Sequence, residues 1–250
     1  MFQMAIQQNW AQPELSDYFV NMASLILLRH GQSTWNFEER FTGWVDVDLT
    51  DKGIEEAYEA GRRLLEEKIP IDVVHTSVLL RAIRTVDATL HAYGRSWVPV
   101  YKHWRLNERH YGALQGHTRA EMASIHGAAQ VRTWRRSYDV RPPLLDLDDE
   151  RHPRFDPRYF NLAPDLLPRA ECLKDVLERM LPYFFDAIVP DIIAGRNVLV
   201  SAHGNSLRAM IKHLENIGDE EILDLELPNG VPIVYEFDEN FKAIKTHQLD

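Results

Sequence analysis

The sequence has 250 residues, of which 45% are hydrophobic and 26% charged, as in ordinary globular proteins. Its formal net charge of -10 disfavours nucleic acids and anionic membranes as partners, and no apolar run is long enough to span a bilayer. The single cysteine, Cys172, excludes an intrachain disulfide and predicts a reducing compartment, the cytoplasm.

The beginning of the chain differs from the rest. Residues 1–21 have neither the basic start nor the apolar core of a secretory signal. We interpret residues 1–21 as a loosely ordered N-terminal appendage, because terminal arms are seldom held tightly. Residues 22–250 are expected to form a single catalytic domain, since no internal repeat or low-complexity segment divides them.

A short apolar run near the N-terminus ends in a cation and an imidazole. Leu25–Leu28 is typical of a strand buried on both faces, and Arg29, His30 and Gly31 follow it. Ligands of open α/β sheets bind at the carboxyl ends of strands, so these residues are expected to meet a substrate. Gly31 is expected to let the backbone approach that ligand closely. For the triplet taken alone, a helix-capping turn is the alternative.

Helices and strands then alternate. Thr50 is a plausible N-cap for a helix over Asp51–Lys68, and Ile71–His75 predicts a second buried strand. Ser77 is expected to cap the next helix, and Trp97–Tyr101 is a third strand candidate. The order of strand, helix, strand, helix, strand predicts a mainly parallel sheet with helices on both faces.

A long segment interrupts this alternation. Residues 105–170 are rich in Arg, Pro, Asp and His, with short helices expected at Arg119–His126 and Ala128–Tyr138. Thr118 and Glu121 have the spacing of a capping box. So long an insertion is usually functional, and we expect it to lie over the active site; a solvated excursion is the alternative.

Regular elements return in the last third of the chain. A helix is expected over Glu171–Val189, kinked at Pro182, followed by a strand over Asn197–Ala202. A helix over Ser206–Ile217 and a strand over Gly230–Phe237 complete the pattern. Asp238–Asn240 is expected to turn. The sequence therefore predicts an α/β three-layer sandwich.

The second strand-end histidine suggests the chemistry. His203 and Gly204 follow the strand over Asn197–Ala202, as His30 and Gly31 follow the first strand, so the two imidazoles are expected to face one another. The sequence lacks a Gly-rich phosphate loop, a dinucleotide fingerprint, a nucleophile elbow and zinc-type spacing of histidines. What remains is a histidine nucleophile among arginines, which suits phosphoryl transfer.

Three further residues have plausible places in such a reaction. Arg29 can hold a phosphoryl oxygen with its planar guanidinium, and Arg81 is placed to reach the same edge; a solvated surface position is the alternative for Arg81. Glu108 is the candidate acid or base, with a salt bridge to Arg105 or Arg109 as its alternative role.

Five segments of the chain carry a resemblance to a known family. In chain order they are Arg29–Gly31, Phe41–Trp44, Leu106–Gly116, Trp134–Arg136 and Ala202–Arg208. With these segments in family order, the chain resembles the cofactor-dependent phosphoglycerate mutases of the histidine phosphatase superfamily, from Ser24 to its C-terminus. The Arg29-His30-Gly31 motif indicates only the superfamily, whereas Glu108–Gly116 and the Arg135-Arg136 pair are far more specific to the mutases.

The resemblance implies a role for each matching residue. It makes His30 the phosphoryl carrier, Glu108 the proton donor and acceptor, and His203 the stabiliser of the transition state. It places Arg29, Ser33, Asn36, Arg81, Gly204 and Asn205 around the phosphoryl group. It places Thr42, Gly43, Arg109, Tyr111, Arg135 and Arg136 at the other end of the substrate. We add Gly31, Gln32, His110 and Arg119 to the expected substrate-binding residues.

Three departures from the family pattern are visible. Arg119 replaces a substrate-binding lysine, which keeps the charge but changes the donor geometry. Ala170 and Cys172 replace the Thr and Ser that open a helix, which is expected to weaken its cap. Only residues 241–250 follow the last expected strand, where the family often has a longer tail near the site. We expect this segment at most to reach the pocket rim, and therefore an appreciable hydrolytic leak.

The resemblance implies interconversion of 3-phosphoglycerate and 2-phosphoglycerate through phosphohistidine, an isomerase activity of glycolysis and gluconeogenesis. 2,3-Bisphosphoglycerate would prime His30, and no metal is expected. The expected partner is a small phosphorylated acid; homo-oligomerisation is left open. A broad phosphomonoesterase using His30 is the closest alternative. A non-catalytic module that binds phosphohistidine or phosphosugars is the third; it predicts loss of His30 or Glu108, and both are present.

Overall fold

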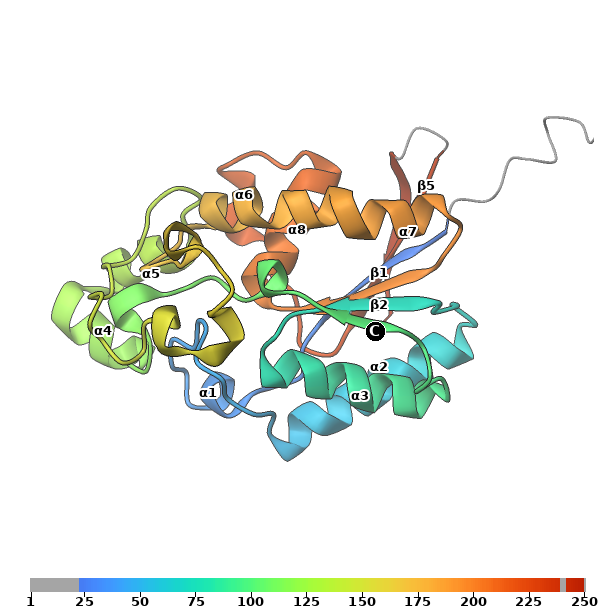
Figure 1. Ribbon diagram of the computed structural model, residues 1–250, viewed down its shortest axis with the longest axis horizontal. Coiled ribbons are helices and arrows are strands. Elements are labelled where there is room, and N and C mark those ends of the chain that lie inside the picture. Colours follow the sequence, from blue (N-terminus) through green and yellow to red (C-terminus); the bar gives the residue numbers. More distant parts are fainter. Residues whose placement is uncertain (1–22, 239–241, 250) are drawn as a thin grey trace, which may run out of the picture.

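Within the described residues, six strands form one mixed sheet in the order β3-β2-β4-β1-β5-β6 (Figure 1). The computed structural model describes residues 23–238 and 242–249, so the appendage expected over residues 1–21 lies outside the described residues. The first four strands run parallel, whereas β5 and β6 run antiparallel to their neighbours. The strands are β1 Leu25–Arg29, β2 Val73–Thr76, β3 Val100–Lys102, β4 Val198–Ala202, β5 Pro232–Phe237 and β6 Ala243–Gln248.

Helices cover both faces of the sheet, as Figure 1 shows, with α2 and α3 on one face and α6, α7 and α8 on the other. The insertion, with α4 and α5, projects from one end of these layers. The predicted three-layer α/β sandwich is therefore confirmed. The helices are α1 Thr34–Phe37, α2 Asp51–Glu66, α3 Leu80–Tyr93, α4 Arg119–His126, α5 Ala128–Arg136, α6 Leu173–Tyr183, α7 Val189–Ile193 and α8 Gly204–Glu215. Short 3-10 turns occur at Trp104–Leu106, Gly112–Leu114, Pro153–Phe155, Pro157–Tyr159, Pro164–Leu166 and Glu221–Asp224.

Strand β1 is buried on both faces, as its continuous apolar run predicts. Leu25 and Leu27 belong to the core cluster that includes the α6 and α8 side chains. Ile26 and Leu28 belong to the cluster on the other side, with Leu64 of α2. Successive side chains of a strand point to opposite faces, so four aliphatic residues in a row fill both layers.

Two predicted helix caps are confirmed and one is wrong. Thr50 Oγ1 accepts the Gly53 N–H at 3.1 Å, and Thr118 forms the expected capping box with Glu121. Helix α3 begins at Leu80, with Leu79 rather than Ser77 at its N-cap. The hydroxyl of Ser77 instead lies 2.7 Å from Nε2 of His203. A residue that suits a cap therefore serves the site.

The helix predicted over Glu171–Val189 is not continuous. Helix α6 begins at Leu173 and contains Pro182, and a π-helical turn over Phe184–Ile188 then leads into α7. Pro182 has no N–H to donate, and an irregular turn is a usual consequence. At the N-cap, Cys172 donates its backbone N–H to Asp175 at 2.8 Å. Other predicted boundaries in β2, β3, α2, α5 and α8 differ from the structure by a few residues.

The C-terminal segment forms a strand that the sequence did not predict, and the hydrolytic leak expected from so short a segment stays a prediction. Strand β6 pairs with β5 and forms an edge of the sheet, so Ala243–Gln248 does not lie at the pocket rim. Exposed edge strands need little apolar sequence, and Ile244 is 63% exposed, which explains the weak signal. The turn expected at Asp238–Asn240 lies mostly outside the described residues. Among the helices described within residues 23–238 and 242–249, none has the length and hydropathy needed to cross a membrane.

Candidate active site

A cavity of about 270 Å³ lies at the carboxyl ends of β1 and β4, where a ligand was expected. Arg29 and His30 at the end of β1 and Gly204 and Asn205 at the start of α8 line its inner end, and the insertion supplies residues from α4 and α5. The predicted site residues that line it are Arg29, His30, Asn36, Thr42, Gly43, Arg81, Glu108, Tyr111, Arg119, Arg135, Arg136, Gly204 and Asn205.

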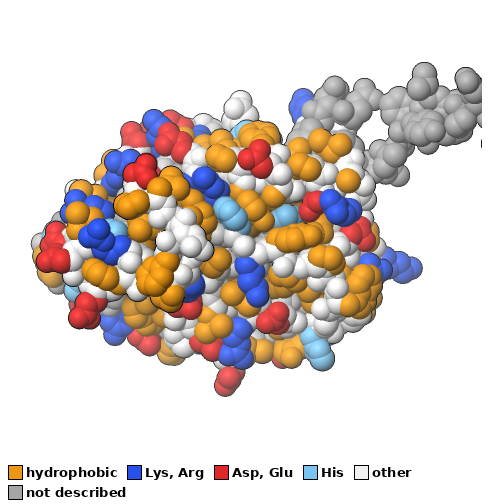
Figure 2. Space-filling model, in the orientation of Figure 1, with side chains coloured by type: hydrophobic (Ala, Val, Ile, Leu, Met, Phe, Trp, Pro, Cys, Tyr) orange, Lys and Arg blue, Asp and Glu red, His pale blue; other side chains and the backbone are white. Residues whose placement is uncertain are grey.

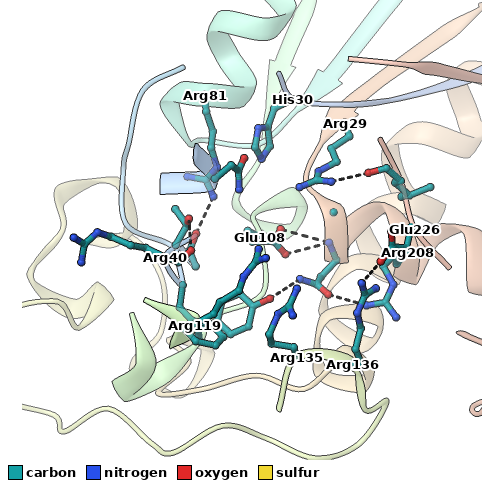
Figure 3. Close-up of a pocket in the computed structure, with 18 of the residues that line it drawn as sticks. Arg29, His30, Arg40, Arg81, Glu108, Arg119, Arg135, Arg136, Arg208 and Glu226 are labelled. Atoms are coloured by element: carbon teal, nitrogen blue, oxygen red, sulfur yellow. Dashed lines mark hydrogen bonds and ion pairs between the residues drawn. The ribbon is translucent and has the colours of Figure 1, made fainter. Parts of the chain in front are cut away.

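The cavity is strongly cationic in a chain whose formal net charge is -10. On the outer face drawn in Figure 2, basic and acidic side chains are interspersed. The cavity lining instead has seven arginines and two carboxylates, Glu108 and Glu226 (Figure 3). Such a concentration of guanidinium groups fits a ligand with several negative charges. The seven are Arg29, Arg40, Arg81, Arg119, Arg135, Arg136 and Arg208.

The imidazole of His30 is held in one tautomer. Its Nδ1 lies 2.7 Å from the carbonyl oxygen of Gly31, which can only accept, so Nδ1 bears the proton. Burial, followed by the nearby charges of Arg81 and Arg29, lowers the pKa of His30 well below its usual value. The ring is therefore neutral at pH 7, with an unprotonated Nε2 as nucleophile.

This environment predicts that the rate of His30 phosphorylation falls at an unusually low pH. A lowered pKa keeps His30 unprotonated as the pH falls through 6.5, the ordinary value. We expect the rate of His30 phosphorylation, measured in single turnovers at saturating donor, to fall only at a pH clearly below 6.5. Saturation removes pH effects on donor binding. A limb centred near pH 6.5 would mean that His30 titrates like an exposed imidazole.

His203 packs edge-on against His30, as the two strand-end motifs predict. The ring centroids are 5.0 Å apart at an interplanar angle of 61°. Nε2 of His203 bonds the hydroxyl of Ser77, and its buried Nδ1 has no partner among the described residues. Burial, then the charge of Arg81 and the ring of His30, lowers the pKa of His203 well below its usual value. If Ser77 donates to Nε2, Nδ1–H is left to bind a phosphoryl oxygen.

Glu108 lies at the N-terminal end of α8. Its Oε1 accepts the backbone N–H of Arg109 at 2.7 Å and that of Asn205 at 3.2 Å. A helix N-terminus favours a negative charge. Among the described residues no ion pair joins Glu108 to Arg105 or Arg109, whose guanidinium groups donate to backbone carbonyls. The salt-bridge alternative for Glu108 is therefore wrong.

A buried ion pair holds the backbone that presents Glu108. Nε of Arg179 donates to Glu171 at 2.6 Å, and Nη2 donates to the carbonyl oxygens of Asn107 and Glu108, both at 2.9 Å. Glu171 in turn accepts the His110 N–H at 2.8 Å. The Arg179 and Glu171 side chains are 8% and 4% exposed. Their bonds fix the loop on both sides of Glu108.

Replacement of Arg179 tests this support. We expect Arg179→Met to lower the free energy of unfolding by about 3–5 kcal/mol, because it leaves Glu171 charged, buried and unpaired. Arg141→Met is the matched control: Arg141 also pairs with a residue of α6, Asp175, but is exposed. We expect it to cost at most about 1 kcal/mol. If urea denaturation shows the same loss of unfolding free energy for both variants, the supporting role of Arg179 is contradicted.

Three predicted site residues organise the loop after β1 instead of lining the cavity. A Cβ added at Gly31 would lie 2.0 Å from the carbonyl oxygen of Gly53, so this glycine permits packing against α2 rather than close approach to a ligand. Gln32 accepts a bond from Thr50 at the start of α2, and Ser33 caps α1. The loop is thereby held in place beside His30.

Arg109 and His110 are also buried outside the cavity lining. Nη2 of Arg109 donates to the Tyr111 hydroxyl at 3.0 Å and to the Arg135 carbonyl oxygen at 2.6 Å, which positions two residues of the lining. His110 accepts the Gly112 N–H, and burial lowers its pKa to about 3. Both residues lie next to the site and support it.

Several lining residues were missing from the sequence-based set. Arg208 follows Gly204 by one helical turn, so the spacing i, i+4 already indicates the same face. Arg40 precedes the Phe41–Trp44 segment. No sequence signal marks Glu226, because an acid in a loop rarely faces an anion site. The missed residues are Arg40, Phe41, Arg208, Leu225, Glu226 and Leu227.

Over residues 23–238 and 242–249, no group of three or more His, Cys, Asp or Glu side chains is arranged to hold a metal ion. Independence from metal ions stays a prediction for experiment. The fold and the site can now be compared with those of known proteins.

Residues 25–150 and 144–250 match the family model of the histidine phosphatase superfamily, branch 1. Over 225 residues the chain is 57% identical to the 2,3-bisphosphoglycerate-dependent phosphoglycerate mutase of Thermobifida fusca (strain YX), covering 90% of this chain and 91% of that protein.

Solved structures of more distant proteins share the fold. A mycobacterial glucosyl-3-phosphoglycerate phosphatase with bound vanadate matches with a TM-score of 0.68 and 22% identity, covering 90% of this chain and 97% of its own. A putative alpha-ribazole-5'-P phosphatase from Escherichia coli matches with a TM-score of 0.67 and 21% identity, covering 92% and 97%. Identities this low show the fold alone.

Proposed function

Because the chain belongs to the histidine phosphatase superfamily, we propose that it interconverts 3-phosphoglycerate and 2-phosphoglycerate through phosphohistidine at His30. The similarity to the Thermobifida fusca mutase supports this isomerase activity, and with it a place in glycolysis and gluconeogenesis. The partner is a small phosphorylated acid, and 2,3-bisphosphoglycerate is the primer. Residence in the cytoplasm stays a prediction.

The observation that supports a mutase over a simple phosphatase is the distribution of arginines. Arg29 and Arg81 lie beside His30, whereas Arg119, Arg135 and Arg136 come from the insertion (Figure 3). A phosphomonoesterase needs cations only around the phosphoryl group. Cations at both ends suit a ligand with an anionic group at each end, as phosphoglycerates and the primer have.

The space beside Gly204 and an unpaired donor of Arg29 fit the cavity to the primer. A Cβ at Gly204 would lie 3.5 Å from Nε of Arg29 and 3.8 Å from Oε2 of Glu108, so the missing side chain leaves space between a cation and the proposed acid. Nε of Arg29 is buried without a partner among the described residues. When bound, 2,3-bisphosphoglycerate supplies the phosphoryl group that primes His30.

In the proposed transfer, Nε2 of His30 bonds the phosphorus as the bond to the departing oxygen breaks. Glu108 protonates that oxygen, or takes the proton from a substrate hydroxyl in the reverse direction. Charge spreads over the phosphoryl oxygens in the transition state, where Arg29 stabilises it and, with Ser77 donating to Nε2 of His203, Nδ1–H of His203 does so too. Nδ1 of His30 keeps its proton, which it donates to the Gly31 carbonyl oxygen, throughout, so the ring receives the group as a neutral imidazole and returns to that same tautomer when the group leaves.

Product analysis tests the proposed function. Wild-type protein incubated with 3-phosphoglycerate and primer, with and without chelator, should form 2-phosphoglycerate at the same rate in both. Glycerate and free phosphate as the main products would instead support the phosphomonoesterase. Loss of activity in chelator, restored by manganese, would contradict the metal-independent mechanism.

A further inference from the structure

Glu226 is an acidic residue in a cavity otherwise built for anions. It lies in the segment Leu225–Leu227, all of which lines the cavity, and its carboxylate pairs with Arg136 (Figure 3). Within the described residues, the neighbouring Arg135 forms no side-chain hydrogen bond or ion pair, although it lines the same wall. One of two adjacent arginines of α5 is therefore already engaged by an anion of the protein.

The surroundings of Glu226 let its side chain move while its backbone stays fixed. Nη1 of Arg29 donates to the Leu227 carbonyl oxygen at 2.6 Å, which ties the segment to the inner end of the cavity. The Glu226 side chain is 75% exposed, against 25% for Arg136. A displaced Glu226 carboxylate can therefore turn into water, whereas Arg136 stays at the cavity and must find another anion.

We propose that Glu226 is an internal competitor for Arg136, which weakens the grip of the cavity on the far anionic group of its ligand. This rests on the proposed function, in which a bound intermediate must release that group in order to turn round. The ion pair between Glu226 and Arg136 forms when the far anionic group of the ligand dissociates from Arg136, and it breaks when a ligand anion binds Arg136 again. The residue thus limits ligand affinity in favour of exchange.

The proposal makes a prediction of definite sign. Every ligand that uses Arg136 must first break its pair with Glu226, and a ligand without a second anion does not. Exposed ion pairs are worth about 0.2–1 kcal/mol, which corresponds to an affinity change of about 1.4- to fivefold. If Glu226 instead serves to support the rim, its replacement should weaken binding.

The test compares two probes by titration calorimetry on the intact protein. Phosphoglycolate has a phosphoryl group and a carboxylate, and ethyl phosphate has only the phosphoryl group. We expect Glu226→Gln to tighten the binding of phosphoglycolate about 1.4- to fivefold, and to change the affinity for ethyl phosphate clearly less. In an Arg136→Met background the same substitution should no longer tighten phosphoglycolate.

Asp224→Asn is the matched control, because Asp224 belongs to the same loop and faces Arg132 at 4.0 Å but does not line the cavity. We expect it to shift the Kd values of both probes by the same small factor. Weaker phosphoglycolate binding by Glu226→Gln, no change, or equal tightening of both probes would each overturn the proposal. Tightening that persists with Arg136→Met would overturn it too.

Failure of this proposal can be told from failure of the proposed function. Both probes are phosphomonoesters, so the calorimetry is carried out in a His30→Ala background, where neither can be turned over, and competition for Arg136 is reported whichever reaction the wild-type protein catalyses. With the mutase reaction established, Glu226→Gln should lower KM and kcat together, because it strengthens ground-state binding and slows release. A lower KM with an unchanged kcat would contradict the role in exchange.

Discussion

Replacing His30 with alanine is expected to abolish phosphoryl transfer while the fold persists. Among the described residues that line the cavity, His30 presents its unprotonated Nε2 beside Arg29 and Arg81. Cys172, the single thiol, is the N-cap of α6 and lies outside that lining. We therefore expect the covalent step to depend on His30. The measurement is acid-labile radioactive label from the primer, which should appear on wild-type protein only.

The control for this experiment is the state of the fold. The strand that precedes His30 is held by Leu25–Leu28, which pack into both core clusters without help from the imidazole. We therefore expect the alanine variant to keep a cooperative thermal transition and to bind phosphoglycolate. Acid-labile label persisting on a folded variant would remove His30 from its proposed role.

The position of the catalytic edge was predictable because two local signals coincide there. Leu25–Leu28 and Val198–Val200 are continuous apolar runs in the buried strands β1 and β4, and in both strands an imidazole follows the last strand residue. Parallel pairing of β1 with β4 then brings His30 and His203 together. Periodicity and the rule that ligands meet carboxyl ends of strands suffice for this much.

What escaped prediction depends on partners distant in the sequence. Gly31 owes its identity to the backbone of Gly53, and Ser77 is drawn from a cap to His203. Neither relation leaves a trace in local spacing. Strand β6 escaped for a different reason, since an edge strand with one face in water needs few apolar residues. Glu226 was not predicted as a site residue because an acidic side chain is not expected in a cavity lined mainly by arginines.

The loop that bears Glu108 was predicted in part. Its role as the candidate acid or base was predicted from the residues of its segment and again from the resemblance, whereas its geometry could not be read from the sequence. Trp44 donates from Nε1 to the Glu108 carbonyl oxygen at 2.6 Å, and Arg179 donates to the same oxygen. An aromatic and a helical arginine, far apart in the chain, thus fix one carbonyl. Such convergence is decided by packing, after the elements have formed.

Replacing Glu108 with glutamine is expected to slow transfer to and from substrate hydroxyls by about a hundred- to ten-thousand-fold, the usual worth of general acid–base catalysis. Glutamine keeps an oxygen that can accept the N–H groups of Arg109 and Asn205, so the loop should hold its shape. It has no proton to give a departing alkoxide and cannot take one from a hydroxyl.

A donor with a good leaving group separates this chemical role from a structural one. Its leaving group departs without protonation, so Glu108→Gln should still allow His30 to be phosphorylated by such a donor at a rate near that of wild type. Transfer onward to 3-phosphoglycerate should fail in the same sample, because that step needs a base for the hydroxyl proton. The two halves of the reaction are followed on one protein by label on His30 and by its discharge. If both halves slow equally, the loop has moved and Glu108 acts through structure; if neither slows, the proton is handled by another group.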